Sequence, residues 1–161
     1  MPLGPFTVNK ALSVSTWTES ALLRNIKNWL GQATPPPPYG MGDDCAVLPT
    51  PSFNLVTTDC IIYKQHFDAN LPPDQAGAKL LKRNLSDIAA MGGIPGNAVI
   101  SLMLPGNVRL DWLHEFYKGL HNTALPWKVL IIGGDLAQTK SDLAATLTLF
   151  GTAQRPIPRK K

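Results

Sequence analysis

Residues 73–93, PDQAGAKLLKRNLSDIAAMGG, form the stretch that decides the fold. The proline at its start suits the first turn of a helix, and Gly92 and Gly93 suit its end. Apolar residues recur between them at helical spacing: Ala76, Leu80, Ile88 and Met91. Asn84 and Asp87 are three positions apart and therefore share a face. The stretch predicts a helix that carries polar groups on one side.

The segments around this helix predict strands and further helices. Upstream, the sequence predicts a helix over residues 18–31, with Thr18 as its N-cap and Gly31 as its stop, and a hairpin of strands from CAVLP and from NLVTTDCIIY, residues 54–63. Downstream it predicts a strand at 97–105, an amphipathic helix at 109–124, a buried strand at 128–134 and a last strand at 143–151. This order predicts an α/β or α+β fold, a mixed β-sheet with helices packed on one face.

A proline-rich segment separates the first helix from the hairpin. QATPPPPYGMG, residues 32–42, contains four consecutive prolines and cannot form a regular helix or a central strand. Because it leads into an acidic pair, we expect it to be poorly ordered until a ligand binds.

Length and composition favour one domain of a cytoplasmic protein. The chain has 161 residues, 44% of them hydrophobic, which is enough for a single core. The net charge is +4, but lysine and arginine are scattered except in the final RPIPRKK, so nucleic-acid binding is not favoured. The two cysteines lack zinc-site spacing and predict buried thiols. We find neither a signal-peptide pattern nor an apolar run long enough for a membrane helix.

Aspartates recur at the junctions of the predicted elements: Asp43, Asp44, Asp59, Asp87 and Asp135. Ligands collect at the carboxyl ends of strands in open α/β sheets, and converging carboxylates need cations between them. Hard oxygen ligands of this kind suit Mg²⁺, particularly when phosphates complete its coordination. Taken singly, each aspartate is also compatible with a turn or a solvated helix, although Asp59 inside an apolar strand is costly to bury unpaired. The pattern therefore suggests one shared magnesium and phosphate site.

Four motifs together resemble a known enzyme family. GDDCAVL, TTDCIIYKQHF, KLLKRNLSDIAAMGG and GGD follow in the order and spacing of the N-terminal, ATP-binding half of thiamine-monophosphate kinase. That family belongs to a superfamily with aminoimidazole ribonucleotide synthetase, selenophosphate synthetase and a hydrogenase maturation protein. NLSDIAAMG carries most of the specificity, and HF seven residues after TTD points to the thiamine-phosphate branch.

The resemblance implies a set of functional residues. It implies that the protein binds Mg²⁺, ATP as a co-substrate, and thiamine monophosphate. His66 matches the position that contacts thiamine monophosphate. Three residues match positions near ATP in addition to Asp135: Tyr117, Gly134 and Arg159. The residues implied to bind Mg²⁺ or phosphate are Asp43, Asp44, Thr57, Thr58, Asp59, Asp87 and Asp135.

The resemblance also implies how the chain is organised. Residues 1–17 are expected to form an N-terminal extension, 18–155 the ATP- and magnesium-binding domain, and 156–161 the start of a linker to an absent C-terminal domain. A homodimer is expected, because superfamily members pair their N-terminal domains. With the second domain missing, we expect the isolated chain to be weakly active or inactive. Leu136, Ala137 and Gln138 stand where the family usually has two Thr-like residues and an arginine.

Two alternatives to a kinase remain open at this stage. One is a non-catalytic module that dimerises and binds nucleotide. The other is a different ATP-dependent enzyme of the same superfamily, which would need other residues around the HF pair. Substrate profiling separates them.

Overall fold

The computed structural model describes Ala11, Thr18, Ser20, Ala21, Arg24, residues 46–48 and residues 54–158. The chain divides into two units, Met1–Met41 and Gly42–Lys161. Predictions for the proline-rich segment, for Asp43 and Asp44, and for Arg159 lie outside the described residues.

In the first unit, the predicted helix start at Thr18 is confirmed. Ser20, Ala21 and Arg24 are helical. The Ala21 backbone N–H donates to Thr18 Oγ1 at 3.2 Å, which is the contact of an N-cap hydroxyl with the third residue of its helix.

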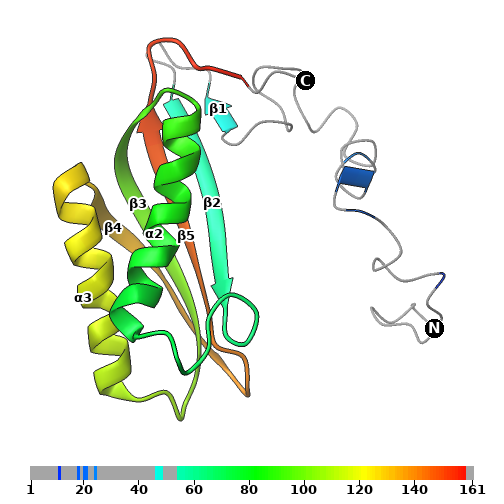
Figure 1. The fold of residues 1–161 in the computed structure, drawn as a ribbon, viewed down its shortest axis with the longest axis vertical. Helices are drawn as coiled ribbons and strands as arrows, with labels where there is room; N and C mark the ends of the chain where they lie inside the picture. The colour runs from blue at the N-terminus through cyan, green and yellow to red at the C-terminus, as the bar shows by residue number, and fades with distance from the viewer. Residues whose placement is uncertain are drawn as a thin grey trace. The chain divides into compact units, whose positions relative to one another are not determined.

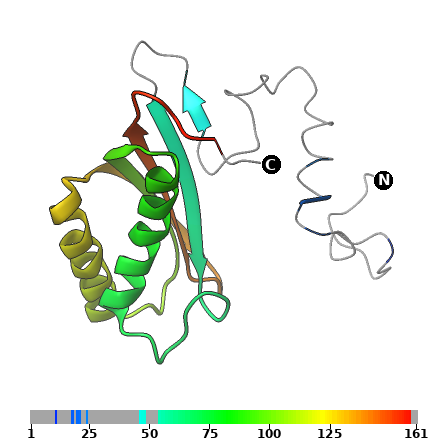
Figure 2. The same cartoon turned by 45° about the horizontal axis from the view of Figure 1, so that its top comes forward.

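The second unit is a five-stranded mixed sheet with two long helices on one face (Figure 1). Its elements in chain order are β1 (Ala46–Leu48), β2 (Asn54–Ile62), α2 (Pro73–Ala90), β3 (Ile94–Pro105), α3 (Leu110–Trp127), β4 (Leu130–Thr139) and β5 (Ala144–Thr152). The strand order is β1-β2-β5-β3-β4, parallel between β3 and β4 and antiparallel elsewhere. Figure 2 shows α2 and α3 side by side over the same side of the sheet. The predicted fold class and hairpin are confirmed.

The helix α2 begins and ends at the residues that the sequence predicts. Pro73 occupies the first turn, where a missing backbone N–H costs nothing. At the other end Gly92 takes φ 67°, and its N–H donates to the Ala89 carbonyl. This left-handed conformation suits glycine and stops the helix. Within the described residues, no helix is long and apolar enough to cross a membrane.

The prediction of a buried strand at residues 128–134 is wrong. β4 is an edge strand of the sheet, and Leu130 and Ile131 on it are 63% and 37% exposed. The strand also continues to Thr139, so Asp135 lies in its middle and not at its carboxyl end. A continuous apolar run is typical of a strand covered on both faces, but an edge position leaves such side chains exposed.

The two helices meet backbone to backbone through two glycines. A Cβ on Gly77 of α2 would lie 2.0 Å from the Phe116 carbonyl oxygen of α3. A Cβ on Gly119 of α3 would lie 1.8 Å from the Asp74 carbonyl oxygen of α2. Neither position has room for a side chain, so this pair of glycines sets the separation of the helices.

The core lies between the helices and the sheet. Its largest fully buried side chains include Phe116, Leu55, Ile61, Leu80, Ile88 and Leu147. At one end of this core, aromatic rings form a continuous series in which Phe67 stacks on Trp112 and Trp112 stacks on Phe116, with ring centroids 5.9 and 5.5 Å apart. The series joins the loop after β2 to α3 and adds to the burial of both.

Gly119→Ala is expected to destabilise the protein by about 2–3 kcal/mol, because the added methyl group forces the helices apart. The sign of the stability change is informative. Alanine is the better helix former, and it would stabilise the helix by about 1 kcal/mol at a position where the added methyl group met no other atoms. Urea unfolding followed by circular dichroism measures the change. Gly133→Ala is the control, because a Cβ there meets no atom within 4 Å. Unchanged stability of Gly119→Ala would show that the helices do not depend on this contact.

Candidate functional site

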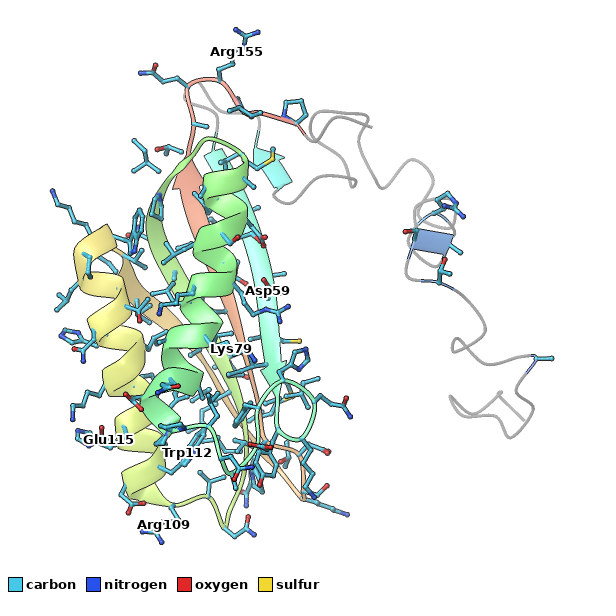
Figure 3. The ribbon with its side chains drawn as sticks, in the orientation of Figure 1. Asp59, Lys79, Arg109, Trp112, Glu115 and Arg155 are labelled. Atoms are coloured by element: carbon cyan, nitrogen blue, oxygen red, sulfur yellow. The ribbon has the colours of Figure 1, made fainter. Side chains whose placement is uncertain are left out.

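An open groove of about 880 Å³ runs between α2 and β2. One stripe of α2 forms its wall at helical spacing, and Asp59 of β2 faces that stripe. In Figure 3, Asp59 and Lys79 lie between the two elements. The lining residues are Asp59, Leu71, Gln75, Ala78, Lys79, Lys82, Arg83, Ser86 and Asp87.

Strand alternation places two residues of the TTD motif toward α2. Thr57 and Asp59 are two apart and so share a face of β2. Thr57 Oγ1 donates to Asp87 Oδ2 at 2.7 Å, and Arg83 donates from its terminal nitrogen (NH2) to Asp59 Oδ1 at 2.8 Å. Thr57 itself is buried, with 6% of its surface exposed. These contacts bring two of the predicted aspartates into one groove.

The groove carries more positive than negative charge among its lining residues. Lys79, Lys82 and Arg83 provide three cations, and Asp59 and Asp87 provide two carboxylates. The Asp59 hydrogen bond raises the pKa of the Arg83 guanidinium above its usual value, and the charges of Asp59 and Asp87 raise it further. A polar groove with this balance suits an anionic ligand, such as a phosphate, together with a metal ion.

The donor set fits Mg²⁺. Asp59 and Asp87 offer carboxylate oxygens, and Mg²⁺ is often held by one or two carboxylates with substrate phosphates and water completing its octahedron. Among the described residues, no three of the types His, Cys, Asp and Glu gather closely enough to hold a metal alone. Any metal in this groove therefore needs ligands beyond the described side chains, and phosphate oxygens are suitable ones.

The hydroxyl group of Thr58 does not contact these aspartates. It lies on the opposite face of β2, where Thr148 Oγ1 donates to Thr58 Oγ1 at 3.1 Å and Thr58 Oγ1 donates to the Leu147 carbonyl at 3.2 Å. A neighbouring residue in a strand necessarily points to the other side of the sheet. Its predicted role in phosphate or metal binding stays a prediction.

Asp135 lies away from the groove. Asp59 pairs with Leu147, Leu147 with Ile100, and Ile100 with Gly134, so Asp135 is three strand steps from Asp59. At about 4.8 Å per step the two backbones are about 14 Å apart, and alternation turns Asp135 to the other face. One ion cannot join both carboxylates within one chain at that separation.

Gly134 and Tyr117 also lie outside the groove lining. Gly134 belongs to β4, where a Cβ would lie 1.7 Å from the Ile100 carbonyl oxygen, so glycine allows β4 to approach β3. Tyr117 is 39% exposed on α3, and its partial burial raises the pKa of its phenol. Their implied contacts with ATP stay predictions.

His66 lies in the loop between β2 and α2, which also carries the groove residue Leu71, but His66 is not itself a lining residue. Its Nδ1 accepts from the Ile62 backbone N–H at 3.1 Å, so neutral His66 carries its proton on Nε2. Lys79 Nζ donates to the His66 carbonyl at 2.5 Å. The loop is therefore anchored to the groove wall, with the imidazole held in one orientation.

None of the three cations of the groove was predicted from the sequence as a site residue: Lys79, Lys82 and Arg83. A signal was present, because Lys79, Arg83 and Asp87 follow one another at intervals of four and must share one helix face. Without the position of β2, that face could not be distinguished from a solvated one.

Comparisons with known proteins identify the family of the chain. Residues 42–153 match the family "AIR synthase related protein, N-terminal domain". The chain is 36% identical over 111 residues to thiamine-monophosphate kinase of Synechococcus elongatus and 37% identical over 117 residues to that of Haemophilus influenzae. These alignments cover 67% and 71% of this chain but 34% and 35% of the relatives, so the chain spans about a third of their length.

A solved structure shares the fold closely. "AaThiL complexed with AMPPCP and TMP" has a TM-score of 0.84 and 26% identity, over 93% of this chain and 47% of that one. The fold and the family are thus supported independently, by the structure and by the sequence.

Thr57→Val is expected to destabilise the protein by about 1–2 kcal/mol, because it removes a hydroxyl donor from the Asp87 carboxylate while keeping the side-chain shape. Thr58→Val is the matched control on the next residue, and a smaller loss is expected there, because Thr58 is exposed and water can replace its bonds to Thr148 and to the Leu147 carbonyl. Urea unfolding of both variants measures the difference. Equal losses in the two variants would contradict a specific role for the Thr57–Asp87 hydrogen bond.

Proposed function

The chain belongs to the AIR synthase related protein family, and we propose that it is the Mg²⁺- and ATP-binding part of a thiamine-monophosphate kinase. The reaction proposed for the whole enzyme is transfer of the γ-phosphoryl group of ATP to the phosphate of thiamine monophosphate, which yields thiamine diphosphate. The observation that carries the proposal is the α2–β2 groove, where Thr57, Asp59 and Asp87 of two recognised motifs come together.

The groove supplies what phosphoryl transfer requires from a protein. Two polyanions must be aligned and their charge neutralised, and a protein nucleophile is not needed. Lys79, Lys82 and Arg83 offer donors to phosphate oxygens along one wall. Asp59 and Asp87 would hold Mg²⁺, and the ion would offset the negative charge of the phosphates. Thr57 fixes the orientation of the Asp87 carboxylate.

Other assignments follow from the family and are part of this proposal. His66 would meet thiamine monophosphate from the loop beside the groove, with its Nε2–H as the donor. The contacts of Tyr117, Gly134 and Asp135 with ATP that the family implies stay predictions, because these residues lie outside the α2–β2 groove. We also infer a cytoplasmic location, where ATP is available; the free Cys60 thiol is compatible with it.

Asp87→Asn is expected to abolish Mg²⁺-dependent binding of a non-hydrolysable ATP analogue, because it removes a charged metal ligand from the groove. Calorimetry with the analogue, with and without Mg²⁺, measures this. Asp74→Asn is the matched control, since Asp74 is an exposed aspartate on the same helix outside the groove lining. Binding that is indifferent to Mg²⁺, or is lost equally in the control, would contradict the proposed site.

A homodimer is part of the same proposal. Both helices cover one face of the sheet, and the opposite face carries Ile62 and Phe150, which are 38% and 37% exposed. An exposed apolar sheet face favours association, and a second copy of the chain is the proposed partner.

Phe150→Asp is expected to shift a dimer toward monomer, because it places a charge in the proposed interface. Light scattering over a range of concentrations measures the mass. Leu125→Asp on α3 is the control, since Leu125 is 60% exposed on the helical layer. A wild-type protein that is monomeric throughout, or a control that dissociates equally, would contradict association through the sheet face.

A further inference from the structure

Arg83 lies beside the two carboxylates of the proposed metal site, Asp59 and Asp87. It is on α2 four residues before Asp87, and it bonds to Asp59 across the groove at 2.8 Å. The side chains of Arg83 and Asp59 are 39% and 22% exposed, so the pair is half-buried and partly shielded from water. The electrostatic influence of both carboxylates reaches the guanidinium.

We propose that Arg83 is a tethered counter-cation for Asp59 that a divalent metal ion must displace, or bind beside against its repulsion. In the metal-free protein the guanidinium balances the carboxylate charge. The affinity of the groove for Mg²⁺ is consequently lower than its two carboxylates alone would give. This inference rests on the proposed function, because it concerns the same metal site.

The contacts of Arg83 distinguish it from the other cations of the groove. Lys79 donates to the His66 carbonyl and anchors a loop. Lys82 lines the groove and is exposed. Among the described residues, Arg83 is the cation that forms a salt bridge with a predicted metal ligand. Neutralising Lys82 therefore lowers the general positive charge of the groove, whereas neutralising Arg83 also frees the Asp59 carboxylate.

Arg83 and a metal ion compete for Asp59 whichever of the two carboxylate oxygens the metal binds. A metal on Asp59 Oδ1 breaks the bond to Arg83 directly. A metal on the other oxygen leaves two cations on one carboxylate, and their mutual repulsion weakens binding. Once displaced, Arg83 stays attached to α2 at the groove wall, where phosphate oxygens are suitable new partners for its planar fork. Binding of metal and phosphate would then be mutually supportive.

Mg²⁺ titrations of the metal-free chain, by calorimetry and by Mg²⁺ competition against Mn²⁺ followed by electron paramagnetic resonance, test the inference. Arg83→Gln is expected to bind Mg²⁺ about three- to fivefold more tightly than the wild type, the upper part of the range for loss of a half-exposed ion pair. Lys82→Gln, the matched control, is expected to change the affinity by no more than about twofold. Arg83→Lys keeps the positive charge beside Asp59 and is therefore expected to bind Mg²⁺ with an affinity close to that of the wild type.

Thermal unfolding provides a readout that does not depend on catalysis. Without metal, Arg83→Gln is expected to unfold at a lower temperature than Lys82→Gln, because Asp59 has lost its counter-cation. Saturating Mg²⁺ is then expected to raise the unfolding temperature of Arg83→Gln more than that of the wild type.

The possible failures are distinguishable. Mg²⁺ affinity in Arg83→Gln that equals or falls below the wild type, or a gain matched by Lys82→Gln, overturns the role of Arg83 and leaves the metal site standing. Absence of Mg²⁺ binding in the wild type and in every variant, both alone and with a non-hydrolysable ATP analogue present, overturns the metal site and this inference together. Should Arg83→Gln fail to fold, Arg83→Met decides, because it removes the charge but keeps an unbranched apolar side chain on the groove wall, and an affinity no higher than the wild type overturns the inference.

Discussion

The constraint on which the rest of the structure depends is the close contact of two glycines, each with the backbone of the facing helix. At Gly77 and Gly119 the backbones of α2 and α3 touch without intervening side chains. Glycine inside a helix costs about 1 kcal/mol relative to alanine, and the tight packing of the two helices offsets that cost. Because the two helices share one face of the sheet, their separation also fixes where the outer face of α2 stands above β2.

One helix thereby serves both the core and the groove. The inner face of α2 buries Leu80, Leu81 and Ile88 against α3 and the sheet. Its outer face carries Lys79, Arg83 and Asp87. A displacement of α2 of even an ångström would move Arg83 and Asp87 relative to Asp59 and Thr57, whose positions are set by the sheet. The packing of the apolar side is therefore the support of the polar side.

The period of a β-strand divides the TTD motif between two environments. Thr57 and Asp59 meet α2, whereas Thr58 bonds to Thr148 on the open face. The same alternation turns Asp135 away from the helices. The sheet therefore separates residues that one motif groups together: some face the groove, and others face the open side of the sheet. Arg83 adds a charge on the groove side that the aspartates alone would not predict.

The sequence by itself determined the elements and the family. The proline and glycines that bound α2, the apolar period within it, the hairpin and the order of strands and helices are local properties, and each was predicted correctly. The recognition of the aspartate motifs also needed no coordinates. These features depend on neighbours within a few residues, or on identities along the chain.

Tertiary structure alone decided which residues meet. The apolar run of β4 does not reveal whether the strand is central or at an edge, because that depends on strand order, and so its burial was predicted wrongly. Likewise, Asp59 and Asp135 look equivalent in the sequence, yet three strand steps separate them. The Arg83–Asp59 pair needed both the face of α2 and the position of β2. Long-range pairing is a property of packing between elements, and no local pattern encodes it.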